Sequence, residues 1–143
     1  MNVVDSCLQD KAQGHVGIME IPIHAIFHEN EYKPGYAAIY VDFNGKQVGF
    51  ASSGSRGAIV FDGQLWLTEH AITLSGAEII KKPEVRVELA DWSVLDEGEN
   101  QYLCVSDNFD GLGRSGHFQK IRYVYILQTR NGHGLFFSVG TIR

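Results

Sequence analysis

The chain has 143 residues, a formal net charge of -5 and 11% aromatic side chains. This composition suits one globular domain and excludes an intrinsically disordered chain. The acidic balance argues against a general nucleic-acid-binding protein. No run of residues approaches the roughly 20 apolar positions of a membrane helix, so we expect no membrane partner.

The two cysteines, Cys7 and Cys104, are far apart and match no zinc-ligand spacing. The first residues also lack the basic and long apolar regions of a secretory signal. A chain with two isolated cysteines is typical of a reducing compartment. The sequence therefore predicts a cytoplasmic protein with two free thiols.

Residues 1–14 carry the weakest pattern, and we expect an arm or a short helix there. From Met19 to Phe27 apolar residues alternate with Glu20, His24 and other side chains. An alternation with period 2 predicts a strand. Pro22 lacks an amide donor, which indicates an edge strand or a bulge.

Two pairs of turn residues predict hairpins in the next stretch. Asn44-Gly45 suits a two-residue type I′ turn, in which Val41 faces Val48 and Ile39 faces Phe50. Asp62-Gly63 repeats the logic and sets Val60 against Leu65 and Ile59 against Trp66. Apolar side chains on both faces place the second hairpin inside the fold.

The second half of the chain continues the same alternation after a short helical segment. A capping box at 75–78 predicts one or two helical turns, which Pro83 would end. Strands follow at 85–94 and 101–106, and then a glycine-rich loop at 107–117. Strands 120–129 and 135–142 flank Asn131-Gly132. A two-residue turn there would pair Val124 with Val139, although Gly134 leaves a longer loop open.

Together these elements predict a single all-β domain over residues 1–143, with minor helix. We expect an antiparallel β-barrel or β-sandwich built from sequential hairpins. The choice between the two depends on whether the edges close.

The motifs of cofactor and metal sites fail in their context. The stretch from Gly111 to Gly116 reads GxGxxG, but a β-rich segment rather than a helix follows it. The acidic loop at 107–111 lacks the spacing of a calcium-binding EF-hand. His24 and His28 would lie about 13 Å apart on one strand, too far to share a metal ion. We therefore expect no cofactor and no metal, and we assign no catalytic residue.

Charge is unevenly distributed along the chain. Acidic residues dominate from 84 to 110, and basic residues dominate from 111 to 143. Lys120 and Arg122, beside tyrosines, could bind single-stranded nucleic acid. We favour neutralisation by the acidic strand at 84–91 instead, and therefore no nucleic-acid partner. An oligomer interface is a further reading of the same asymmetry.

The second faces of three predicted strands mix ionisable and aromatic groups, as ligand cavities do. We therefore predict a protein that binds a small apolar or aromatic ligand. Its pocket would contain His24, His28, Tyr40, Tyr123 and Tyr125. The alternatives are a homo-oligomeric interaction protein without catalysis, and an enzyme whose histidines and carboxylates come from separate strands. We favour a protein without catalysis, and we expect a homo-oligomer in either case.

Overall fold

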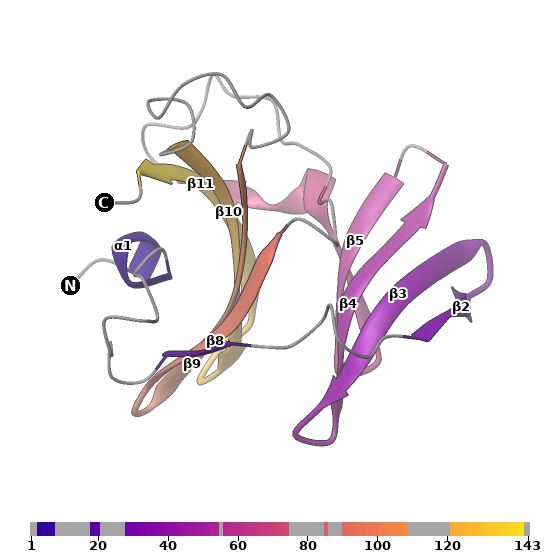
Figure 1. The fold of residues 1–143 in the computed structure, drawn as a ribbon, viewed down its shortest axis with the longest axis horizontal. Coiled ribbons are helices and arrows are strands. Elements are labelled where there is room, and N and C mark those ends of the chain that lie inside the picture. Colours follow the sequence, from indigo (N-terminus) through magenta and orange to yellow (C-terminus); the bar gives the residue numbers. More distant parts are fainter. Residues whose placement is uncertain are drawn as a thin grey trace.

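The computed structural model describes residues 3–7, 18–20, 28–54, 56–74, 85, 90–108 and 121–141. Two β-sheets face each other (Figure 1). In spatial order, the six-stranded sheet holds β1 (Ile18–Glu20), β8 (Asp91–Glu97), β9 (Asn100–Asn108), β10 (Ile121–Arg130), β11 (Gly134–Thr141) and β7 (Ile72–Thr73). The five-stranded sheet holds β2 (His28–Lys33), β3 (Tyr36–Phe43), β4 (Lys46–Ser53), β5 (Arg56–Phe61) and β6 (Gln64–Leu67). The helical elements are α1 (Val3–Cys7) and the 3₁₀ turn η2 (Thr68–His70).

This architecture confirms the predicted all-β class. Neighbouring strands are antiparallel except β11 and β7, which run parallel. The described strands form two open sheets, so the arrangement is a sandwich and no barrel closure is seen among them. Tight turns between consecutive strands explain the antiparallel pairing, because a two-residue loop can join only antiparallel strands.

Two hairpins form in the predicted register. Val41 lies opposite Val48, and Val60 lies opposite Leu65. Asn44 and Asp62 have φ angles of 51° and 50°. Their glycine neighbours also have positive φ, as a type I′ turn requires at both central positions.

The predicted two-residue turn between β10 and β11 is wrong. Val124 faces Ser138 rather than Val139, and Ile126 faces Phe136 rather than Phe137. The loop is one residue longer, and Gln128 Nε2 holds it by donating to the carbonyls of Arg130 (3.3 Å) and Asn131 (3.1 Å). Because strand side chains alternate, a shift of one residue changes which face of β11 meets the core.

Several other predictions meet the structure only in part. Of the strand expected at 85–94, the part from Asp91 is seen in β8; Val85 and Ala90 are buried outside it, and residues 86–89 lie outside the described part. The strand expected at 19–27 is seen as β1, and residues 21–27 lie outside the described part. The helical turns expected after the capping box at 75–78 also lie outside it. Of the loop expected at 107–117, residues 107 and 108 belong to β9 instead, and the rest lies outside the described part. The short helix allowed within residues 1–14 is present as α1.

An apolar layer fills the space between the two sheets. Trp92, Phe137 and Ile59 are at most 1% exposed, and they belong to one cluster contributed by both sheets. A polar link crosses the same layer: Tyr125 is hydrogen-bonded to Thr68, whose hydroxyl donates to the carbonyl of Gly57 at 3.2 Å. This link satisfies hydroxyl groups that would be costly to bury alone.

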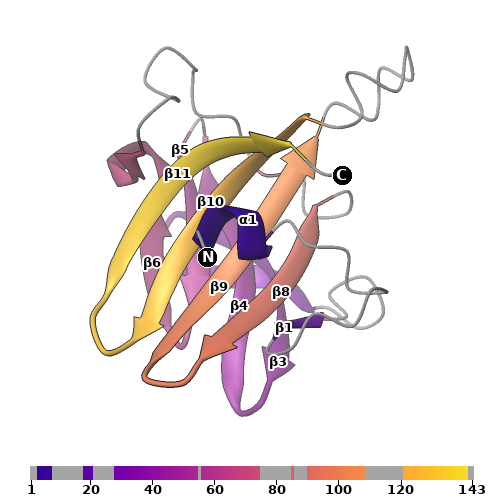
Figure 2. The same ribbon diagram turned by 90° about the vertical axis from the view of Figure 1, so that its left-hand side faces the viewer.

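The outer face of the six-stranded sheet is covered by α1, which lies across β8 to β11 (Figure 2). Val4 and Cys7 pack there against Leu95, Val124 and other residues of the sheet. Cys7 and Cys104 form a disulfide, with a Cα–Cα distance of 5.6 Å. The prediction of two free thiols is therefore wrong. A separation of 97 residues hid the pair, because only folding brings α1 over β9.

The inference of a reducing compartment rested on free thiols and loses that support. Disulfides form and persist mainly in oxidising compartments. The cytoplasmic location stays an untested prediction.

The disulfide should contribute strongly to stability, because a five-residue helix is too short to persist by itself. The double variant Cys7→Ala/Cys104→Ala should lose about 2–5 kcal/mol in the free energy of unfolding. Chemical denaturation monitored by circular dichroism measures this loss.

A reductant provides the matched control. Dithiothreitol should destabilise the wild type and leave the double variant unchanged. Alkylation of denatured, unreduced wild type should modify neither cysteine; two modified cysteines would contradict the disulfide.

Candidate functional site

The residues predicted to share a pocket lie on different faces. Tyr40 lies on the outer face of the five-stranded sheet, where it packs with Ala38, Ala51 and Val60. Tyr123 and Tyr125 belong to the inner face of the six-stranded sheet. The backbone of His28 pairs with Tyr40 at the sheet edge, and His24 lies outside the described residues. The structure thus separates Tyr40 from the other two tyrosines, and the ligand-binding role of the five residues remains a prediction.

Tyr125 fills the core. It is 2% exposed, and its ring centroid lies 5.1 Å from that of Phe137. Burial raises the pKa of Tyr125 above its ordinary value, and the hydrogen bond with Thr68 offsets part of this effect. Burial also raises the pKa of Tyr123, which is only partly buried and lies 6.0 Å from Phe137. Neither phenol is poised to exchange a proton near neutral pH.

Hairpin turns gather at one end of the sandwich. Figures 1 and 2 show the β3–β4, β8–β9 and β10–β11 turns at this end. The β5–β6 turn joins them, since the backbone N–H of Asp62 donates to the carbonyl of Gln47 at 2.8 Å. Loops on a rigid scaffold are where binding groups usually lie.

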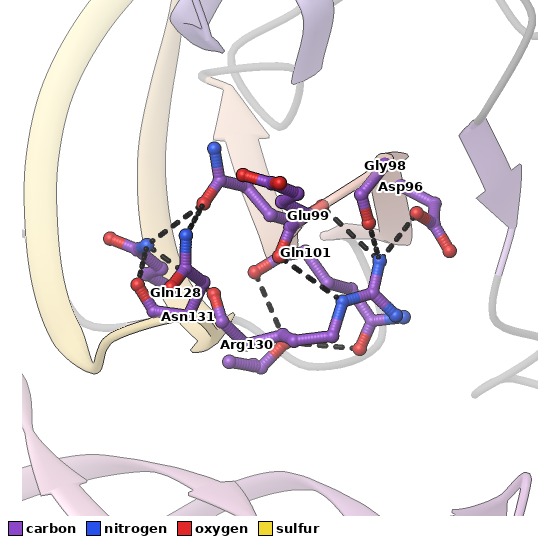
Figure 3. A network of polar contacts seen from close by, with 9 residues as sticks. Asp96, Gly98, Glu99, Gln101, Gln128, Arg130 and Asn131 are labelled. Atoms are coloured by element: carbon purple, nitrogen blue, oxygen red, sulfur yellow. Dashed lines mark hydrogen bonds and ion pairs between the residues drawn. The ribbon is translucent and has the colours of Figure 1, made fainter.

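Arg130 binds two of these turns together (Figure 3). One of its terminal nitrogens donates to Asp96 and to the carbonyl of Gly98, both at 2.6 Å. Asn131 adds a bond to the side chain of Asn100 at 3.2 Å. These bonds tie the β10–β11 turn to the β8–β9 turn, and they hold the loop that carries His133. Asp96 belongs to the acidic segment 84–110 and Arg130 to the basic segment 111–143. Their side chains form an ion pair here, although β9 lies between their strands.

A shallow, open depression of about 360 Å³ lies beside β6, lined by Gly63, Gln64, Leu65 and Trp66. The Trp66 and His133 rings are parallel within 4°, with centroids 6.3 Å apart. The pair therefore joins the edge of one sheet to a turn of the other. Parallel rings at this separation attract each other in an offset arrangement.

The indole N–H of Trp66 is buried and has no hydrogen-bond partner among the residues that the structure describes. Buried indole N–H groups usually donate a hydrogen bond, because a buried donor without one costs about 1–3 kcal/mol. Trp66 also lines the open depression, so it is the best-supported candidate for ligand contact within the described residues.

The charges around this end have both signs. Lys46 Nζ lies 5.5 Å from the centre of the Phe61 ring, as in a cation–π contact. Asp62 is exposed at the β5–β6 turn. At the opposite end of β5, Arg56 and Glu69 form an ion pair at 3.1 Å, with both side chains about half exposed. The site thus offers one apolar wall, one unused donor and a nearby carboxylate.

Neither Trp66 nor His133 was among the predicted site residues. The sequence places Trp66 on a hairpin strand and His133 next to a turn, 67 positions later. The only available signal was a large aromatic residue on a short strand, and it does not name its stacking partner.

Within the described residues, no cluster of three or more histidine, cysteine, aspartate or glutamate side chains could hold a metal ion. The described helices are too short to span a membrane. Comparisons with protein-family models, with curated proteins and with solved structures find no match.

The raised pKa of Tyr125 predicts a pH dependence of stability. An unfolded chain ionises its phenol near pH 10, whereas the folded chain keeps it neutral. The stabilisation is therefore complete below about pH 10 and is lost as pH rises through the higher folded pKa. Tyr125→Phe should lose about 1 kcal/mol at pH 7 with the hydrogen bond to Thr68.

Urea denaturation between pH 8 and pH 11 tests this dependence. Tyr125→Phe should show a shallower alkaline loss of stability than the wild type. Tyr36→Phe, on the outer face of the other sheet, is the matched control. Equal alkaline slopes for wild type and Tyr125→Phe would count against a buried, neutral phenol.

Proposed function

We propose that this protein is a binding module rather than a catalyst, and that its ligand docks in the depression beside β6. The ligand would present a planar or apolar group to Trp66 and a hydrogen-bond acceptor to the indole N–H. This keeps the predicted ligand class, a small apolar or aromatic group, and moves its site away from the predicted tyrosines and histidines.

One observation carries the proposal: Trp66 lines an open depression, and its buried indole N–H has no hydrogen-bond partner within the described part of the chain. A buried donor without a hydrogen bond raises the free energy of the folded protein, whereas an exposed donor bonds water instead. A hydrogen-bond acceptor on a ligand would remove this cost. The stacked His133 supports the ring of Trp66 and limits its rotation. The β10–β11 turn, which carries His133, is held by the hydrogen bonds of Arg130. The site is therefore preorganised for a ligand.

Heteronuclear NMR of the indole N–H groups tests this proposal, because the chain has only two tryptophans. Benzamide and benzoate supply an aromatic ring with an acceptor, and benzylammonium supplies the ring without one. The two acceptor probes should shift the Trp66 indole signal, with dissociation constants of about millimolar for molecules this small. Trp92, which is 1% exposed in the core, is the internal control.

Trp66→Phe keeps a ring and removes the donor. It should weaken benzamide binding roughly two- to tenfold, the range expected for one hydrogen bond, and leave benzylammonium unaffected. If neither benzamide nor benzoate moves the Trp66 signal at about 10 mM, the proposed function fails.

A further inference from the structure

β6 is the last strand of its sheet, and its outer edge pairs with no strand in the described part of the chain. Its four residues, Gln64–Leu67, pair with β5 on one side. No backbone hydrogen bond joins its other side to any described residue. The strand carries no charge and no proline, the features by which proteins usually block an exposed edge.

The register decides which backbone groups point outward. Phe61 and Gln64 close a two-residue turn and exchange both of their backbone hydrogen bonds. In an antiparallel pair, bonded and non-bonded positions alternate along the strands. Leu65 is therefore the position whose N–H and C=O groups both face away from β5, and the N–H of Leu67, the N-cap residue of η2, faces the same way.

We propose that an extended peptide segment of another protein adds to β6 as an antiparallel strand. Its backbone bonds Leu65 and Leu67, and one of its side chains enters the depression at Trp66. This inference rests on the proposed function, because it uses the same depression, and it names the class of ligand. Strand addition of this kind draws affinity from main-chain bonds and specificity from alternate side chains.

The geometry also specifies the peptide. In this pairing the residue opposite Trp66 lies between the two bonded positions, and an aromatic side chain there would reach the indole. An antiparallel segment then runs past Gln64 toward the β5–β6 turn, so its residue four positions further on comes near Asp62. Asp62 is exposed and has no ion-pair partner among the described residues, so a lysine or arginine complements it.

A second copy of the chain is the less fitting occupant. Stable interfaces bury about 800 Å² on each partner, and pairing of two four-residue edges supplies a small part of that area. A peptide needs only the backbone bonds and one anchoring side chain.

Leu67 offers a clean test, because its φ of -63° already matches the fixed φ of proline. Leu67→Pro removes one outward N–H without straining the backbone, and Trp66, in a strand, suits the position before proline. Leu67→Ala shortens the side chain and keeps the donor, so it is the matched control. Circular dichroism and the Trp92 indole signal check that both variants are folded.

The probe is the acetylated and amidated peptide TVTFTVTK, titrated by NMR and calorimetry. We expect Leu67→Pro to weaken binding about tenfold or more, and Leu67→Ala by less than about threefold. N-methylation of the two threonines that flank phenylalanine should weaken binding to the wild type to a similar extent, because it removes the amide donors and keeps every side chain.

The outcomes separate the two proposals. If the N-methylated and parent peptides bind equally, and Leu67→Pro binds like Leu67→Ala, strand addition is wrong while the Trp66 site stands. If neither the peptide nor benzamide moves the Trp66 signal, the proposed function fails as well. If sedimentation shows a wild-type dimer that Leu67→Pro dissociates, a second copy occupies the edge and the peptide proposal is overturned.

Discussion

Burial of two apolar sheet faces against each other is the constraint on which the rest of the structure depends. Trp92 from one sheet and Ile59 from the other meet in a single cluster that excludes water. Each sheet alone would expose that face, and burial of large side chains contributes about 1.5–3 kcal/mol each. Because the layer also fixes the inward faces of β6 and β10, it determines which side chains remain at the edges.

The position of Trp66 at the edge of the described five-stranded sheet follows from this packing. The inward face of β6 carries Trp66, and the turn after β10 carries His133, so closing the sandwich brings the two rings together. Arg130 holds that turn against its neighbour. The candidate site therefore results from the packing of the two sheets, which brings Trp66 and His133 together, and not from a motif along the chain.

The outer face of the six-stranded sheet also has apolar side chains to bury, and a helix packs against it instead of a second sheet. Its apolar residues, among them Ile126 and Val124, would face water without a cover. The single turn of α1 covers part of them, and the disulfide from Cys7 to Cys104 keeps this short element in place. A covalent bond substitutes here for the packing area that a longer helix would provide.

The sequence by itself determined the local features whose cause is local. Asn44-Gly45 and Asp62-Gly63 need positive φ in consecutive residues, so they predict both the turns and the registers beside them. At Asn131 the same signal failed, because bonds from Gln128 stabilise a longer loop and shift the register by one residue. That shift replaces the predicted pair of Val124 and Val139 with the pair of Val124 and Ser138.

Only the tertiary structure decided what depends on contacts between distant segments. The Cys7–Cys104 pair spans 97 positions, and the stacked Trp66 and His133 come from different sheets. The predicted pocket residues Tyr40 and Tyr125 share an alternation pattern but lie on opposite sides of the five-stranded sheet. Periodicity reveals that a strand has two faces, but which face meets the core is settled by the packing of the two sheets.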